Sequence, residues 1–132
     1  RGYIEAGLWV SYAHDDVTGA EHESLEGFDV ADIDTATLQQ MVADCQQFQR
    51  ENEKLLLEAS GLGHYANHEP WHPEVTAAMR AGHDFFLTHC GYGVGFWDRG
   101  LGEIGDQLTK ACDKYGSWHF WLESGKIFGE KG

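Results

Sequence analysis

The feature that most constrains the fold is a long amphipathic helix pattern at about residues 35–59. Apolar side chains recur there at steps of three and four residues, the period of an α-helix with one buried face. Asp34 or Thr35 can cap the start of this helix, and Gly61 can end it. Because such a helix must bury its apolar face, the pattern predicts a packed domain. The apolar positions are Leu38, Met41, Val42, Cys45, Phe48, Leu55, Leu56 and Ala59.

The segments on either side of this helix carry signals for further elements. Residues 3–12 alternate between apolar and polar side chains, and a period of two predicts a β-strand with one buried face. Pro73 suits the first position of a second helix, which would end near Cys90, and a third helix is expected over residues 103–115. The C-terminal segment alternates around Ser124-Gly125, which predicts a β-hairpin with a tight turn.

This order of elements predicts an α+β fold. We expect a small antiparallel sheet, formed by the N-terminal strand and the C-terminal hairpin, packed by about three helices. A chain of 132 residues is the size of one domain, and it contains no internal repeat and no linker that would divide it. The prediction is therefore a single domain over residues 1–132, with an acidic loop at about residues 13–34.

The charge of the chain is strongly negative and unevenly distributed. The net charge is −13, and residues 1–60 carry 13 acidic and 3 basic side chains, against 9 and 6 in residues 61–132. This excludes bare nucleic acid and anionic membranes as expected partners, because phosphates are bound by clustered cations. It favours a basic or nucleic-acid-binding protein, while solubility alone is the alternative explanation. The candidate acidic surface consists of Asp15, Asp16, Glu21, Glu23, Glu26, Asp29 and Asp32.

A glycine-rich segment with aromatic residues, GYGVGFWDRGLG, occupies residues 91–102. One interpretation is structural: the glycines let the chain turn so that Phe96 and Trp97 reach the core, and Asp98 and Arg99 hydrogen-bond to the backbone or to each other. The other is that a rigid loop presents side chains to a partner. The G-x-G-x-x-G match that starts at Gly100 lacks a preceding strand, so nucleotide binding is not expected. The candidate interaction residues are Tyr92, Trp97, Asp98 and Arg99.

The segment AGHDFFLTHCGYGVGFWDRGLGEIGDQLTKACDKYG, residues 81–116, resembles uncharacterised small proteins of bacteriophages and mobile elements. Those proteins share an F-W-L-T-x-x-G-x-G-x-G-F-W-D-R-G motif, and the segments YIEAGLW and ADCQQF are also similar to them. The sequence departs from the family pattern T-R-N-G-H-G at residues 88–93, where it reads THCGYG. The resemblance implies a source and a fold, and it implies no reaction.

The stretch HEPWH, residues 68–72, matches the H-E-x-x-H pattern of zinc proteases. That chemistry needs both histidines on one helix face, and Pro70 disfavours helical geometry at the residue before it. The pattern therefore predicts a loop and no protease. A metal-binding domain or a small metal-dependent hydrolase remains the alternative function, with His64, His68 and His72 as weak candidate ligands, and no cofactor is expected.

The uneven charge, the high aromatic content of 13% and the lack of a coherent catalytic set together favour a non-enzymatic function. The three cysteines form no C-x-x-C motif, which is typical of a reduced compartment, and no signal peptide or membrane-spanning run is present. We therefore expect a cytoplasmic accessory protein of a bacterial host cell that binds a host or phage protein. An inhibitor that imitates nucleic acid is one form of this hypothesis, and a structural virion component is another alternative.

Overall fold

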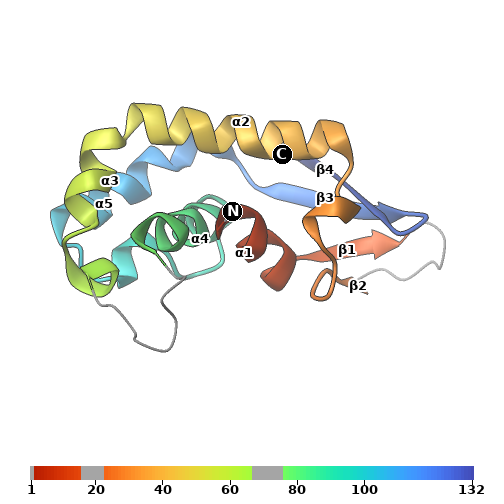
Figure 1. The fold of residues 1–132 in the computed structure, drawn as a ribbon, viewed down its shortest axis with the longest axis horizontal. Helices are drawn as coiled ribbons and strands as arrows, with labels where there is room; N and C mark the ends of the chain where they lie inside the picture. Colours follow the sequence, from red (N-terminus) through yellow and green to blue (C-terminus); the bar gives the residue numbers. More distant parts are fainter. Residues whose placement is uncertain (1, 16–22, 67–75) are drawn as a thin grey trace.

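The structure is a computed structural model that describes residues 2–15, 23–66 and 76–132. The strands gather at one end of the molecule and α3 and α5 at the other, while α2 runs along one side (Figure 1). The helices are α1 (Gly2–Val10), α2 (Thr35–Glu51), α3 (Glu53–Ala59), α4 (Ala77–His89) and α5 (Glu103–Ala111). The strands are β1 (Tyr12–Asp15), β2 (Glu23–Ser24), β3 (Trp118–Glu123) and β4 (Lys126–Lys131). Short 3₁₀ turns are η1 (Val30–Asp32), η2 (Gly63–Ala66), η3 (Phe96–Asp98) and η4 (Asp113–Tyr115).

The prediction of an α+β fold with a small sheet is confirmed, but the N-terminal strand over residues 3–12 is wrong. Residues 2–10 form α1, which packs closely against α4, and Tyr12 already belongs to β1. Tyr3 and Ala6, which alternation would place on opposite faces of a strand, lie three residues apart on the buried side of the helix. Gly82 permits the close approach, because a Cβ at this position would lie 2.8 Å from the backbone nitrogen of Tyr3.

The sheet is mixed, whereas a purely antiparallel sheet was expected. Its strand order is β2-β1-β3-β4, and the short strand β1 pairs in parallel with β3. The outer edge of β4 is covered by the start of α2, since Asp34 donates its N–H to the carbonyl of Ile127 at 2.7 Å. The hydroxyl of Thr37 accepts a further bond from the N–H of Gly129 at 3.1 Å. This edge is therefore not free to pair with a strand of another protein.

The C-terminal hairpin and its tight turn are confirmed. Strands β3 and β4 pair antiparallel from Trp118 opposite Lys131 to Glu123 opposite Lys126. The two turn residues, Ser124 and Gly125, have φ angles of 51° and 78°. Positive φ at both central positions is the geometry that matches the twist of a two-residue hairpin.

Replacing Ser124 with asparagine is expected to raise the free energy of unfolding by about 0.5 kcal/mol, because asparagine adopts positive φ at lower cost. Replacing it with valine is expected to lower that free energy, because a branched Cβ is strained at this angle. Urea denaturation of both variants measures the difference. An asparagine variant no more stable than the valine variant would contradict the turn assignment.

The predicted helix over residues 35–59 is broken at Asn52, so it forms α2 and α3. The Asn52 side chain is buried and donates to the carbonyl of Phe48 at 2.9 Å, which competes with the helical backbone bonds. The predicted cap is confirmed, since the Asp34 carboxylate accepts a bond from the N–H of Thr37 at 3.1 Å. The second predicted helix begins at Ala77 and not at Pro73, because Thr76 is extended and caps it: the Thr76 hydroxyl accepts a bond from the N–H of Met79 at 3.1 Å. Pro73 itself lies outside the described part of the chain.

The third predicted helix is present as α5 and continues through the 3₁₀ turn η4 to Tyr115. The core at this end of the molecule is aromatic. Phe48 and Phe85 stack with their ring centroids 4.1 Å apart, and Tyr115 packs edge-on to both. Such ring pairs fix the distance between α2, α4 and η4. In residues 2–15, 23–66 and 76–132, no helix is long and apolar enough to cross a membrane.

Candidate functional site

The acidic segment between β2 and α2 is held in place by its own carboxylates. Asp29 accepts a bond from the N–H of Val30 at 2.6 Å, and Asp32 accepts one from the N–H of Asp29 at 2.8 Å. Together they form a capping box around η1. Glu26 and Asp29 are exposed and Asp32 is half-buried, so the segment presents ordered negative charge to solvent. The other predicted acidic residues lie outside the described part of the chain, or have side chains outside it: Asp15, Asp16, Glu21 and Glu23.

The glycine-rich segment does not present its four candidate residues as one surface. Tyr92, Trp97 and Asp98 are exposed, whereas Arg99 turns inward. Phe96 is fully buried as the structural interpretation predicted, but Trp97 is 43% exposed and does not reach the core. Arg99 is expected to bond to the backbone or to Asp98, and it instead forms an ion pair with a carboxylate on α4.

That carboxylate belongs to Asp84 on α4, which is only 2% exposed. The Nε of Arg99 donates to its two oxygens at 3.0 and 3.2 Å, and Nη2 lies 2.9 Å from Oδ1. The hydroxyl of Tyr65 donates to Oδ2 at 2.5 Å. Burial, together with the nearby Asp84 carboxylate, raises the pKa of Tyr65 well above its ordinary value, so the hydroxyl stays a donor.

The three side chains tie η2 and the glycine-rich segment to α4. The N–H of His64 also donates to the carbonyl of Arg99 at 2.9 Å, which adds a backbone link. The buried Asp84 carboxylate is paired with Arg99 and hydrogen-bonded by Tyr65, so it holds three segments of the chain together. We call it the Asp84 clamp, and it defines the floor of a surface groove.

We define the Trp9 groove as two adjoining hollows of about 410 Å³ each that share Glu5, Trp9 and His83. Trp9, near the end of α1, is 64% exposed, the largest exposed fraction of any tryptophan among the described residues. The hollow toward the acidic segment is further lined by Leu8, Glu26, Gly27, Phe28 and Asp29. The hollow toward the Asp84 clamp is further lined by His64, Tyr65, Met79, Arg80, Asp84 and Arg99.

The two ends of the Trp9 groove differ in charge. At the clamp end, Arg99 is paired with Asp84, and Arg80 donates to the carbonyl of His64. At the acidic end, Glu26 and Asp29 stand beside the apolar surface of Trp9 and Phe28, and no lysine or arginine is among the described residues that line it. An aromatic face flanked by carboxylates is a favourable environment for a cation.

A second buried network lies outside the groove and was not expected from the sequence. The indole of Trp118 donates to the hydroxyl of Tyr3 at 2.7 Å, which in turn lies 2.7 Å from Nε2 of His89. Nδ1 of His89 lies 2.6 Å from the carbonyl of Gly116, which can only accept. Nδ1 therefore carries the proton, and Nε2 accepts from Tyr3. Burial lowers the pKa of His89, which favours the neutral ring that these hydrogen bonds require.

The cysteines and histidines do not assemble a reactive site in the described residues. Burial raises the pKa of the Cys90 thiol to about 11 and those of Cys45 and Cys112 to about 12, so their thiolates are scarce at neutral pH. Within the described ranges, no group of three His, Cys, Asp or Glu side chains could hold a metal ion. Of the weak metal candidates, His64 is exposed on η2, while His68 and His72 lie outside those ranges.

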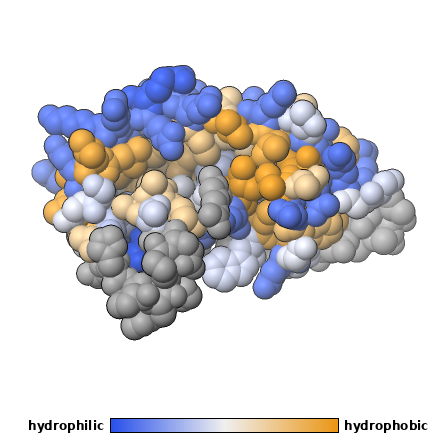
Figure 2. Space-filling model, viewed as in Figure 1, coloured by the Kyte–Doolittle hydropathy of each residue, from blue (hydrophilic) through white to orange (hydrophobic). Residues whose placement is uncertain are grey.

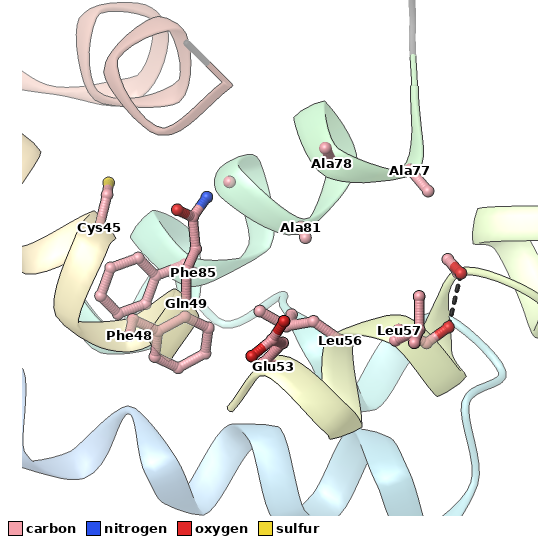
Figure 3. A pocket seen from close by; sticks show the side chains of 12 residues that line it. Cys45, Phe48, Gln49, Glu53, Leu56, Leu57, Ala77, Ala78, Ala81 and Phe85 are labelled. Carbon is pink, nitrogen blue, oxygen red and sulfur yellow. Dashed lines mark hydrogen bonds between the residues drawn. The ribbon is translucent and has the colours of Figure 1, made fainter. Parts of the chain in front are cut away.

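An apolar cleft of about 340 Å³ opens between α4 and the pair α2 and α3 (Figure 3). We call it the α3–α4 cleft. In Figure 2, hydrophilic side chains gather along the upper edge over α2, and hydrophobic ones gather toward the middle of the same face. The residues that line the cleft are Cys45, Phe48, Gln49, Glu53, Leu56, Leu57, Ser60, Ala77, Ala78, Ala81, Gly82 and Phe85.

Comparison with known proteins adds no family to this description. No protein-family model, no curated protein and no solved structure matches the chain.

Proposed function

We propose that the chain is a non-enzymatic accessory protein that binds a basic segment of another protein in the Trp9 groove. A partner that normally binds nucleic acid fits best, because its binding surface clusters lysine and arginine. In this proposal the carboxylates at the acidic end of the groove bind the partner's cationic side chains, which otherwise bind the phosphates of nucleic acid.

The observation that carries the proposal is the position of Trp9. Trp9 is 64% exposed, so most of its large side chain does not pack in the core. The same side chain lines both hollows of the groove. Tryptophan and arginine dominate the binding energy of many protein interfaces. Here the indole lies beside Glu26 and Asp29, so it offers both a stacking face and opposite charge to an incoming cation.

The overall charge supports the same partner. With a net charge of −13, the protein attracts a basic protein over a distance and repels nucleic acid and anionic lipid. Such attraction weakens as added salt screens the charges. Binding is therefore expected to be strongest at low ionic strength.

Replacing Trp9 with alanine is expected to weaken binding of a short peptide of alternating arginine and serine by about tenfold, because the cation loses its aromatic face. Isothermal titration calorimetry at low salt measures the dissociation constant. A peptide with citrulline in place of arginine has nearly the same shape without the charge. It should bind to the unaltered protein at least as weakly as the arginine peptide binds to the Trp9→Ala variant.

The matched control is Trp97→Ala, since Trp97 is also exposed but does not line the Trp9 groove. It should leave the affinity unchanged. Glu26→Gln should weaken binding by about threefold, and Glu58→Gln, at another exposed position, should not. Equal losses for Trp9→Ala and Trp97→Ala, or equal binding of the two peptides, would contradict the proposal.

A further inference from the structure

The α3–α4 cleft exists because the N-terminal half of α4 presents only small residues to it. Ala77, Ala78 and Ala81 face the cleft, while the other side of α4 packs closely on α1. The opposite wall is formed by Leu56 and Leu57 of α3 (Figure 3), and Leu57 is 73% exposed. The cleft has a volume of about 340 Å³, which is within the range of pockets that bind small molecules.

The interior of the cleft is apolar and ends on aromatic rings. Phe48 and Phe85 stack there with an interplanar angle of 12°, and both are buried. The thiol of Cys45 at the same end stays neutral, because burial raises its pKa to about 12. A hydrocarbon body is therefore the part of a ligand that this region accepts.

The charge at the mouth of the cleft is negative. Glu53 and Gln49 lie on its rim (Figure 3), and both are exposed. Ser60 is already engaged, since its hydroxyl donates to the carbonyl of Leu57 at 2.6 Å. No lysine, arginine or histidine is among the described residues that line the cleft. The Glu53 carboxylate would attract a cationic head and repel an anionic one.

We propose that the α3–α4 cleft binds a small amphipathic amine, with an aryl or alkyl body against Phe48 and Phe85 and a primary ammonium group at Glu53. The Gln49 amide oxygen supplies a second acceptor for the same ammonium group. This site is separate from the Trp9 groove and does not depend on the function proposed above.

Three probes of one shape test the proposal: 4-phenylbutylamine, 4-phenylbutanol and 4-phenylbutanoate. Each is titrated into isotope-labelled protein and followed by NMR. We expect the amine to bind about threefold to fivefold more tightly than the alcohol, which is the size of an exposed charge interaction, and the carboxylate to bind most weakly. Shifts should centre on the backbone amides of Ala81, Phe85 and Leu56.

Two variants separate the charge from the cavity. Glu53→Gln should abolish the preference for the amine and leave the affinity for the alcohol unchanged, with Glu58→Gln as the matched control on the same helix. Ala81→Leu should reduce the binding of the amine and of the alcohol, because the larger side chain fills the cleft. Circular dichroism checks that this variant is folded. Equal binding of all three probes, shifts confined to residues outside the cleft, or an unaltered preference in Glu53→Gln would overturn the proposal.

Discussion

Replacing Asp84 with asparagine is expected to lower the free energy of unfolding by about 3 kcal/mol. The carboxylate is 2% exposed and receives the Arg99 guanidinium and the Tyr65 hydroxyl at once. The asparagine variant leaves the guanidinium without its counter-charge, and the side chain of Arg99 is only 28% exposed to water. Urea denaturation followed by circular dichroism measures the loss.

The matched control for this prediction is Asp98→Asn. Asp98 is adjacent to Arg99 in the sequence and is exposed, so its replacement should change the free energy of unfolding by less than about 0.5 kcal/mol. If the two variants lose similar amounts, the sequence-adjacent pair matters as much as the buried one. That result would contradict the Asp84 clamp as the support of the glycine-rich segment.

Stability is also expected to fall as the pH drops below about 6.5, through the titration of His89. Burial lowers the pKa of His89 in the folded protein, while the unfolded chain titrates near about 6.5. Between those two values the unfolded state holds more protons than the folded state, so the free energy of unfolding rises with pH. The contribution is complete above about pH 6.5, and it is lost as the pH falls toward the lower, folded value.

The His89→Gln variant identifies the source of this slope. It removes the titrating ring and should flatten the dependence between about pH 5.5 and 7 by up to about 1.4 kcal/mol per pH unit. At about pH 8 it should cost about 2 kcal/mol, because the bonds to Tyr3 and Gly116 are disrupted. His119→Gln, at an exposed position on β3, should keep the slope. An unchanged slope in His89→Gln would show that other groups cause it.

Local signals in the sequence predicted local structure well. The Asp34 cap, the amphipathic pattern of α2 and the Ser124-Gly125 turn each depend on neighbours within a few residues, and each is confirmed. The break at Asn52 was missed because an asparagine is compatible with a helix until its side chain bonds to the carbonyl of Phe48.

The N-terminal segment was misassigned because its apolar residues fit two periods. Ile4, Ala6 and Leu8 alternate as in a strand, but Ile4 and Leu8 are also one helical turn apart. What decides for a helix is packing against α4, where Gly82 allows the backbones to approach. That contact joins segments about eighty residues apart, and no local pattern in either segment reveals it.

The candidate site could be predicted only in part for the same reason. The acidic segment and Arg99 were both identified from the sequence, but as two separate surfaces. The structure places Glu26 and Asp29 at one end of the Trp9 groove and Arg99 at the other, joined by Trp9. The partner of Arg99 is fifteen residues away on α4, and charge alone does not distinguish Asp84 from an exposed aspartate.

Mapping the bound peptide by NMR is the decisive test of whether the Trp9 groove binds a cationic segment. Isotope-labelled protein is titrated with the arginine–serine peptide, and the Trp9 indole signal is assigned by its loss in the Trp9→Ala variant. We expect saturable shifts of that indole and of the backbone amides of His83, Gly27 and Phe28. Shifts that leave the Trp9 indole unmoved and instead follow the Trp97 indole or the exposed acids of α3 would contradict it.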